Sequence, residues 1–217
     1  MIRAVIFDMD GLIVDTEWPD YQSWQELYAA HGHELSLEEW VPYVGLWGPP
    51  LNLLERLAGL IGEGADRGAL RERRRARCDE LVREGLTPMP GFDALIERLT
   101  AHDYRRGLAS TSSRDWVDFI VDGLGVRHRF DALVAGDEVS ARKPAPDVYL
   151  RAAERLGVAP EECVALEDSA PGVASARAAG MACIAVLNRV TVRHDLSAAH
   201  HRVADLAEVT LELLRSL

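Results

Sequence analysis

The chain has 217 residues, of which 48% are hydrophobic and 27% charged, and its formal net charge is −11. This balance is typical of a soluble globular protein with room for one full domain and a smaller insert. The acidic charge excludes broad nucleic-acid binding, which needs a basic surface, and no apolar run approaches the roughly 20 residues that span a membrane.

The cysteines and the first residues bear on the cell compartment. Cys78, Cys163 and Cys183 lie far apart, and their spacing fits neither a disulfide framework nor a metal site. Residues 2–7 have the pattern of a strand and no signal-peptide architecture. We therefore expect a protein of the reducing cytoplasm, with a monomer as the expected assembly and a dimer as the alternative.

Short apolar runs bounded by Gly, Asp or Ser predict buried parallel strands. They lie at residues 4–7, 107–110, 132–135, 163–166 and 182–186. Between them, apolar residues recur at helical spacing, as over residues 92–99 and 149–156. This alternation of strand and helix predicts an α/β fold built on a doubly wound parallel sheet.

The alternation stops between residues 16 and 87, where only helical patterns occur. Tyr21, Trp24 and Tyr28, for example, share one helix face. We predict an α/β catalytic core formed by residues 1–15 and 88–217, with a helical cap domain of residues 16–87 inserted after the first strand. Ligands in open α/β sheets bind beyond the carboxyl ends of the strands, so this cap would cover the site and select the substrate.

Two carboxylates follow the first predicted strand. Asp8 and Asp10 are two positions apart in extended chain, so their side chains point to the same side. One is suited to act as a nucleophile and the other as a general acid and base. Gly11 permits a sharp turn that exposes backbone N–H groups to an anion. The alternative is an ordinary Asp-Gly turn.

Polar residues also follow the second predicted strand and open a later helix. The hydroxyls and N–H groups of Ser110, Thr111 and Ser112 can hold a phosphoryl oxygen, although such clusters also cap helices. Lys143 is the only lysine among 24 lysine and arginine residues. Its compact ammonium suits an aspartate nucleophile and a developing phosphoryl charge. The alternative is a surface lysine.

Glu167 and Asp168 follow the strand predicted at residues 163–166. Adjacent carboxylates at a strand end suit a hard, oxygen-liganded cation such as Mg²⁺. Helix capping by Asp168 or Ser169 is the alternative. Four polar clusters at the carboxyl ends of separate strands nevertheless predict a single site, because those ends meet at one edge of a parallel sheet.

In their order along the chain, these clusters resemble the four motifs of the haloacid dehalogenase-like superfamily. The matching residues are Phe7-Asp8-Met9-Asp10-Gly11, Ser110, Lys143 and Leu166-Glu167-Asp168-Ser169. The resemblance covers nearly the whole core and implies that family's fold, with a small helical cap after the first motif. The dehalogenases that name the superfamily lack an equivalent of Asp10, so its presence favours phosphoryl transfer over haloacid cleavage.

The resemblance also implies a role for each motif residue. Asp8 would form an aspartyl-phosphate, while Asp10 would protonate the leaving oxygen and then activate water. Ser110 and Lys143 would hold the phosphoryl group and orient Asp8. The implied Mg²⁺ ligands are Asp8, the backbone carbonyl of Asp10 and Asp168, with Glu167 assisting.

Within the superfamily, the stretch from Asp10 to Glu17 and the stretch from Lys143 to Asp147 are similar to the β-phosphoglucomutase and sugar-phosphatase group. The substrate, on this basis, is a small phosphorylated metabolite. The residues that we expect to bind it are Gly11, Thr111, Ser112, Glu17 and Arg114.

Two positions depart from the mutase pattern. That enzyme has a histidine in its first cap helix where this chain has Asp20, and a cap arginine where residues 45–50 read Gly-Leu-Trp-Gly-Pro-Pro. A mutase must hold a second phosphate while the first reacts, so the missing arginine favours a phosphatase. A phosphomutase and a non-catalytic binding or regulatory protein are the alternatives, and the intact motif carboxylates speak against the latter.

Overall fold

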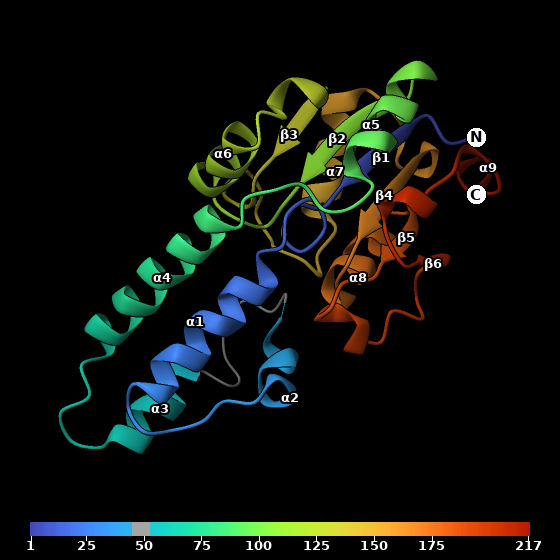
Figure 1. Cartoon of the computed structure of the whole chain (residues 1–217). Coiled ribbons are helices and arrows are strands. Elements are labelled where there is room, and N and C mark those ends of the chain that lie inside the picture. The colour runs from blue at the N-terminus through green and yellow to red at the C-terminus, as the bar shows by residue number, and fades with distance from the viewer. Residues whose placement is uncertain (45–52) are drawn as a thin grey trace.

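The centre of the molecule is a six-stranded, fully parallel sheet with the strand order β3-β2-β1-β4-β5-β6 (Figure 1). The computed structural model describes residues 1–44 and 53–217. The strands are Ala4–Phe7 (β1), Arg105–Ala109 (β2), Ala132–Val134 (β3), Cys163–Glu167 (β4), Ala182–Val186 (β5) and His201–Val203 (β6). The chain adds strands on one side of β1 and then returns to its other side, which confirms the doubly wound α/β fold.

The five predicted strands are confirmed, each with ends within two residues of the predicted ones. The sixth strand, β6, was missed. Of its three residues, His201 and Arg202 are exposed and Val203 alone is buried. An edge strand of this kind carries no apolar run, so hydrophobic patterning does not detect it.

Helices cover both faces of the sheet. On one face lie α5 (Phe92–Ala101), α6 (Arg114–Gly123) and α9 (Leu211–Arg215), and on the other lie α7 (Asp147–Leu156) and α8 (Ala170–Ala178). Along β1, Val5 and Phe7 pack into the first layer, while Ala4 and Ile6 pack into the second. Strands buried on both faces explain why these runs are continuously apolar. The 3₁₀ helices are Val41–Tyr43, Arg127–Arg129, Gly136–Glu138, Pro160–Glu162, Thr191–Arg193 and Leu206–Glu208.

Between residues 16 and 87, the described part of the chain contains helices and no strand. The α-helices are Glu17–Ala29 (α1), Leu37–Trp40 (α2), Leu53–Ile61 (α3) and Arg67–Glu84 (α4), and they lie together beside one end of the sheet (Figure 1). Tyr21, Tyr28, Trp40 and Leu57 belong to a hydrophobic cluster that is separate from the two on the faces of the sheet. These features fit the predicted helical cap.

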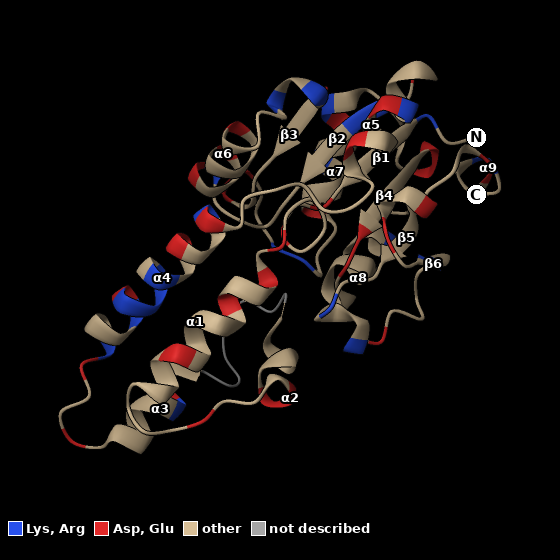
Figure 2. Ribbon diagram, in the orientation of Figure 1, with Lys and Arg blue, Asp and Glu red and all other residues tan. Residues whose placement is uncertain are grey.

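Charge is distributed unevenly over these helices, and Figure 2 shows arginines gathered along α4. Two of them hold α4 against α1, since Arg77 Nε lies 2.7 Å from Glu26 Oε2 and Arg74 is paired with Asp20. Charge pairing therefore supplements apolar packing between α1 and α4. In the two described ranges, no helix is both long and apolar enough to cross a bilayer.

Candidate active site

The polar residues predicted at the strand ends do meet, beyond the carboxyl ends of β1, β2 and β4. This is the point at which the strand order reverses, where open α/β sheets bind ligands. Asp8, Lys143, Glu167 and Asp168 are all buried. Buried charges are rare unless they are paired or bind a metal, so this cluster needs a functional explanation.

Lys143 is a buried residue and not the surface lysine that was the alternative. Its Nζ lies 2.5 Å from Asp8 Oδ1 and 2.6 Å from Glu167 Oε1, and it donates to the carbonyl oxygen of Ala109 at 3.2 Å. Burial by itself would lower the pKa of Lys143, but the charges of Asp8 and Glu167 outweigh burial and raise it. The ammonium therefore stays charged and holds the Asp8 carboxylate in place.

Tyr149 supports the same cluster from α7 and was not predicted as a site residue. Its hydroxyl donates to Glu167 Oε1 at 2.6 Å, and Lys143 Nζ lies 4.8 Å from the centre of its ring. A buried tyrosine needs a partner for its hydroxyl. Its place on the apolar face of α7 indicates packing alone, so no signal in the sequence pointed to this contact.

Glu167 is also held from α8. Ser169 Oγ donates to Glu167 Oε2 at 3.2 Å and accepts from the backbone N–H of Gly172 at 3.2 Å, so Ser169 caps the helix. A Cβ atom on Gly172 would lie 1.9 Å from Glu167 Oε2. The glycine therefore leaves room for the carboxylate.

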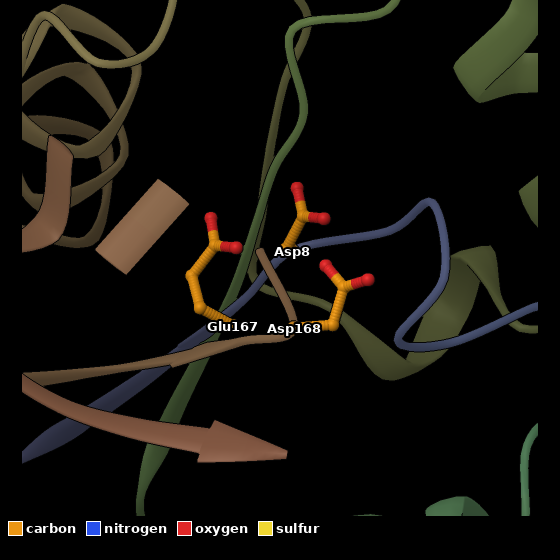
Figure 3. Close-up of side chains that lie close together, drawn as sticks. All are labelled: Asp8, Glu167 and Asp168. Carbon is orange, nitrogen blue, oxygen red and sulfur yellow. The ribbon is translucent and has the colours of Figure 1, made fainter. Parts of the chain in front are cut away.

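Asp8, Glu167 and Asp168 form a candidate metal site, and Figure 3 shows their carboxylates converging. One oxygen of each lies within 4.8 Å of the others. Burial, with the charges of Glu167 and Asp10, raises the pKa of Asp8 to about 7 even though Lys143 opposes the shift. Burial and the charges of Asp8 and Glu167 likewise raise the pKa of Asp168. An oxygen-rich, negatively charged cluster of this kind fits a hard divalent cation.

Asn188 positions Asp168 and is a second residue that sequence reasoning missed. Its Nδ2 donates to Asp168 Oδ2 at 2.8 Å and to the carbonyl oxygen of Gly11 at 3.0 Å. Gly11 has φ +77°, and a Cβ there would lie 2.4 Å from Asp168 Oδ2. Asn188 is the second residue after β5. The search for polar residues that follow each predicted strand would therefore have found it if it had been extended to β5.

Asp10 is bound by a separate set of side chains. Its Oδ2 accepts from Ser112 Oγ at 2.7 Å and from Ser110 Oγ at 3.2 Å. Its Oδ1 accepts from Trp116 Nε1 at 3.0 Å. The structure thus brings the two predicted serines to the second carboxylate, and it adds Trp116, a residue on α6 that was not predicted.

Glu17 faces the cluster from the first turn of α1. It is half-buried, and burial, followed by the charges of Asp20, Asp10 and Asp8, raises its pKa. Thr111 lies half-exposed in the loop between Ser110 and Ser112. Both positions fit the predicted contact with a substrate.

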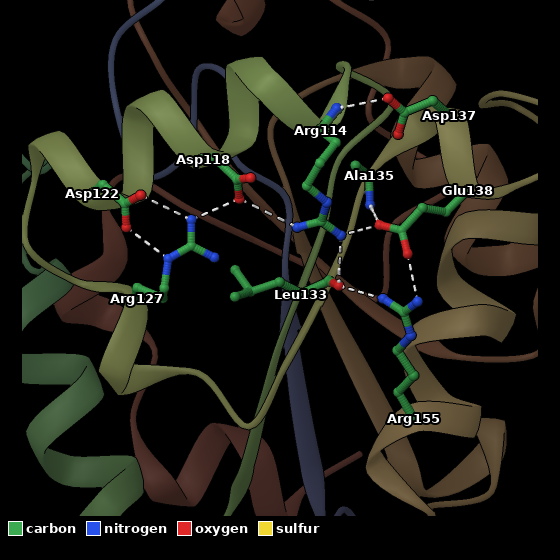
Figure 4. A network of polar contacts seen from close by, with 9 residues as sticks. All are labelled: Arg114, Asp118, Asp122, Arg127, Leu133, Ala135, Asp137, Glu138 and Arg155. Carbon is green, nitrogen blue, oxygen red and sulfur yellow. Dashed lines mark hydrogen bonds and ion pairs between the residues drawn. The ribbon is translucent and has the colours of Figure 1, made fainter.

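Arg114 is not brought to this cluster. Its guanidinium is paired with Glu138 and donates to the carbonyl oxygen of Leu133 at 3.2 Å, within a network on α6, β3 and α7 (Figure 4). Glu138 also pairs with Arg155, while Arg114 Nη1 lies 3.5 Å from Asp118 Oδ1. These contacts give Arg114 a role in joining the elements around β3.

Of the two departures from the mutase pattern, only Asp20 lies within the described residues. Asp20 is paired with Arg74 and accepts from Cys78 Sγ at 3.8 Å, so it belongs to the packing of α1 on α4. Residues 45–50, where the mutase arginine is missing, lie outside the described residues.

Comparison with known families agrees with this geometry. The family model described as haloacid dehalogenase-like hydrolase matches residues 2–180. The chain belongs to the haloacid dehalogenase-like hydrolases. The expected nucleophile, Asp8, and the expected metal ligand Asp168 both lie inside the matched range.

Three relatives illustrate where the chain falls within this family. YhcW of Bacillus subtilis, named as a candidate phosphatase, is 37% identical, covering 99% of this chain and 96% of its own. YqaB of Escherichia coli, a fructose-1-phosphate phosphatase, is 33% identical over 84% of this chain and 95% of its own. A crystal structure of CbbY from Rhodobacter sphaeroides in complex with phosphate has a TM-score of 0.77 and 29% identity, covering 99% of this chain and 100% of that one.

Proposed function

We propose that the chain is a Mg²⁺-dependent phosphatase that hydrolyses a small phosphate monoester through an aspartyl-phosphate on Asp8. The observation that carries this proposal is the pair of carboxylates at the end of β1. Asp8 is buried and fixed by Lys143 at 2.5 Å, whereas Asp10 is half-buried and bound by neutral donors. A fixed carboxylate suits nucleophilic attack, and a second carboxylate bound by exchangeable hydroxyls suits proton transfer.

The reaction follows from these positions. Asp8 attacks phosphorus, the bond to the leaving oxygen breaks, and Asp10 gives that oxygen a proton. Asp10 then takes a proton from water, which attacks the phosphorus of the aspartyl-phosphate and releases phosphate from Asp8. Ser110 and Lys143 bind the phosphoryl oxygens during both steps and stabilise the developing negative charge. Gly11, Thr111, Ser112 and Glu17 complete the proposed substrate contacts.

Asp8, the backbone carbonyl of Asp10, and Asp168 are the proposed ligands of Mg²⁺, and Glu167 assists from behind them. The bound ion supplies positive charge that offsets the carboxylates and the phosphoryl oxygens. Tyr149 and Ser169 bind the two oxygens of Glu167, and Asn188 binds Asp168, so both acidic side chains are oriented before an ion arrives.

The proposed substrate is a small phosphorylated metabolite such as a sugar phosphate, in keeping with the printed activity of YqaB. Residues 16–87 form the proposed cap over the substrate, and Glu17 faces the site from it. We further propose a cytoplasmic protein that acts as a monomer. The three free, buried cysteines suit a reducing compartment.

A phosphate-release screen tests the proposed function. Sugar phosphates, nucleotides and glycolytic intermediates are incubated with the enzyme and Mg²⁺, beside Asp8→Asn as the matched variant. We expect release from at least one ester, and a loss of roughly 10³-fold or more in the variant, as for removal of a nucleophile. No release from any ester, or undiminished release by Asp8→Asn, would contradict the mechanism. Interconversion of a sugar phosphate without release would indicate a mutase instead.

A further inference from the structure

The two carboxylate oxygens of Asp10 have chemically different neighbours. Oδ1 accepts from the indole Nε1 of Trp116 at 3.0 Å, and Oδ2 accepts from the hydroxyls of Ser112 at 2.7 Å and Ser110 at 3.2 Å. An indole N–H can only donate, whereas a serine hydroxyl can donate or accept. The two sides of the carboxylate therefore respond differently when Asp10 gains a proton.

Protonation of Oδ1 would turn it into a hydroxyl oxygen, a poorer acceptor than a carbonyl oxygen, and would weaken the Trp116 bond. Protonation of Oδ2 leaves that bond intact, because Ser112 can turn its hydroxyl and accept instead. The hydrogen-bond pattern thus favours the proton on Oδ2. It also holds the plane of the carboxyl group in the same orientation with and without the proton.

The position of Trp116 on its helix argues that this contact is more than packing. The buried face of α6 is made by Val117, Ile120 and Val121, whereas Trp116 is half-buried beside them. Its ring packs on Phe119 with the centroids 5.4 Å apart, and its N–H points to the end of β1. The indole is therefore braced on one side and bonded to Asp10 on the other.

Resting on the proposed phosphatase function, we propose that Trp116 is a positioning residue that holds the Asp10 carboxyl group in one orientation, with Oδ1 toward the indole N–H and Oδ2 toward the serine hydroxyls. In the first step, the bond between phosphorus and the leaving oxygen breaks, and the proton on Oδ2 passes to that oxygen. In the second step, a proton of the attacking water returns to Oδ2 as the phosphorus–Asp8 bond breaks. Trp116 keeps Oδ1 as an acceptor throughout and touches no reacting atom.

Esters that differ in leaving group separate this role from a structural one. An alkyl phosphate must receive a proton on its leaving oxygen, whereas the phenolate of p-nitrophenyl phosphate leaves without one. Trp116→Phe removes the N–H and keeps an aromatic ring. We expect kcat/KM for an alkyl phosphate to fall roughly 10- to 100-fold, less than the ~10²–10⁴-fold that a whole acid–base group contributes. The value for p-nitrophenyl phosphate should fall less than about threefold, since no proton transfer limits that step.

Two further variants make the result decisive. Phe119→Leu weakens the packing of the Trp116 ring but keeps the indole N–H, so it should lower kcat/KM for the alkyl ester less than Trp116→Phe does. Asp10→Asn is the reference for full loss of the acid and should penalise the alkyl ester far more than the aryl ester. Equal losses on both esters in Trp116→Phe, or no loss on either, would overturn the role of Trp116 alone. If Asp10→Asn lowered kcat/KM equally for the alkyl and the aryl ester, the proposed role of Asp10 would be overturned, and that of Trp116 with it.

Discussion

At the scale of single residues, the site depends on which charges are buried together. Lys143 is the only lysine of the chain, and it lies between Asp8 and Glu167 at 2.5 and 2.6 Å. A guanidinium could not replace it easily, because a planar fork does not fit three short contacts around one point. The single lysine of the chain thus stands where a compact ammonium is needed.

Replacing Lys143 by methionine keeps the volume and removes the charge. In Mg²⁺-free buffer we expect the free energy of unfolding to fall by about 3–5 kcal/mol, because Asp8 and Glu167 remain buried without a cation. Urea unfolding measures the change. Arg151→Met is the matched control, since it breaks the exposed Arg151–Glu154 pair and should cost no more than about 1 kcal/mol. Equal costs for the two variants would contradict the account.

The site residues that could be predicted from sequence lie in motifs, whereas those that were missed reach the site from helices. Asp8, Asp10 and Lys143 were found because each stands in a motif at a predicted strand end or helix start. Tyr149 and Trp116 were missed because they reach the site from helices, and helical patterning assigns such aromatic residues to packing. Which side chain turns toward a neighbour depends on tertiary packing, so local sequence could not show it.

At the scale of secondary-structure elements, α8 and the loop after β5 hold the acidic residues. The first turn of α8 passes so close to Glu167 that glycine is needed at position 172. The loop after β5 carries Asn188, which binds Asp168, and Val190, which packs in the hydrophobic cluster formed by residues of α1 to α4. This loop therefore connects the candidate metal site to the helical segment between β1 and α5.

Gly172→Ala tests the close approach of α8. In an ordinary helix this change stabilises by about 0.5–1 kcal/mol. Here the added Cβ would meet the Glu167 carboxylate, and we expect a destabilisation of about 1–3 kcal/mol, as for overpacking, with reduced phosphatase activity. Gly59→Ala in α3 is the control, because its Cβ would meet nothing within 4 Å. Thermal unfolding of both variants gives the comparison, and a stabilised Gly172→Ala would contradict the argument.

Asn188→Ala tests the support of Asp168. Removal of a residue that hydrogen-bonds a metal ligand typically lowers metal affinity about 10- to 100-fold. We expect the Mg²⁺ affinity of Asn188→Ala to fall by a factor in that range. Isothermal titration calorimetry measures it directly. Val192→Ala changes a half-exposed residue of the same loop and should leave the affinity unchanged. Unaltered Mg²⁺ binding in Asn188→Ala would show that Asp168 needs no such support.

At the scale of the whole molecule, an acidic protein has to bind an anionic substrate. The net charge of −11 repels phosphate esters at long range, so attraction must come from the site itself. Lys143, the donors of the Ser110–Ser112 loop and the proposed Mg²⁺ provide it over a few ångströms. The catalytic carboxylates can therefore act on a phosphate ester only when nearby cations offset their negative charge.

Much of this architecture could be predicted from the sequence. Buried parallel strands leave continuous apolar runs, and the break in alternation revealed the helical segment between β1 and β2. The edge strand β6 could not be predicted, because two of its three residues are exposed. The position of Arg114 could not be predicted either, because its partners Glu138 and Leu133 come from other elements.

The most direct test of the central claim is to capture the phosphoryl group on Asp8. The enzyme is mixed with a substrate ester and Mg²⁺, reduced with borohydride during turnover, and digested for mass spectrometry. An aspartyl-phosphate is reduced to homoserine, so we predict homoserine at position 8 in the wild type and none when substrate is omitted. An unmodified Asp8 in a turning-over enzyme, or homoserine at another aspartate, would contradict the account.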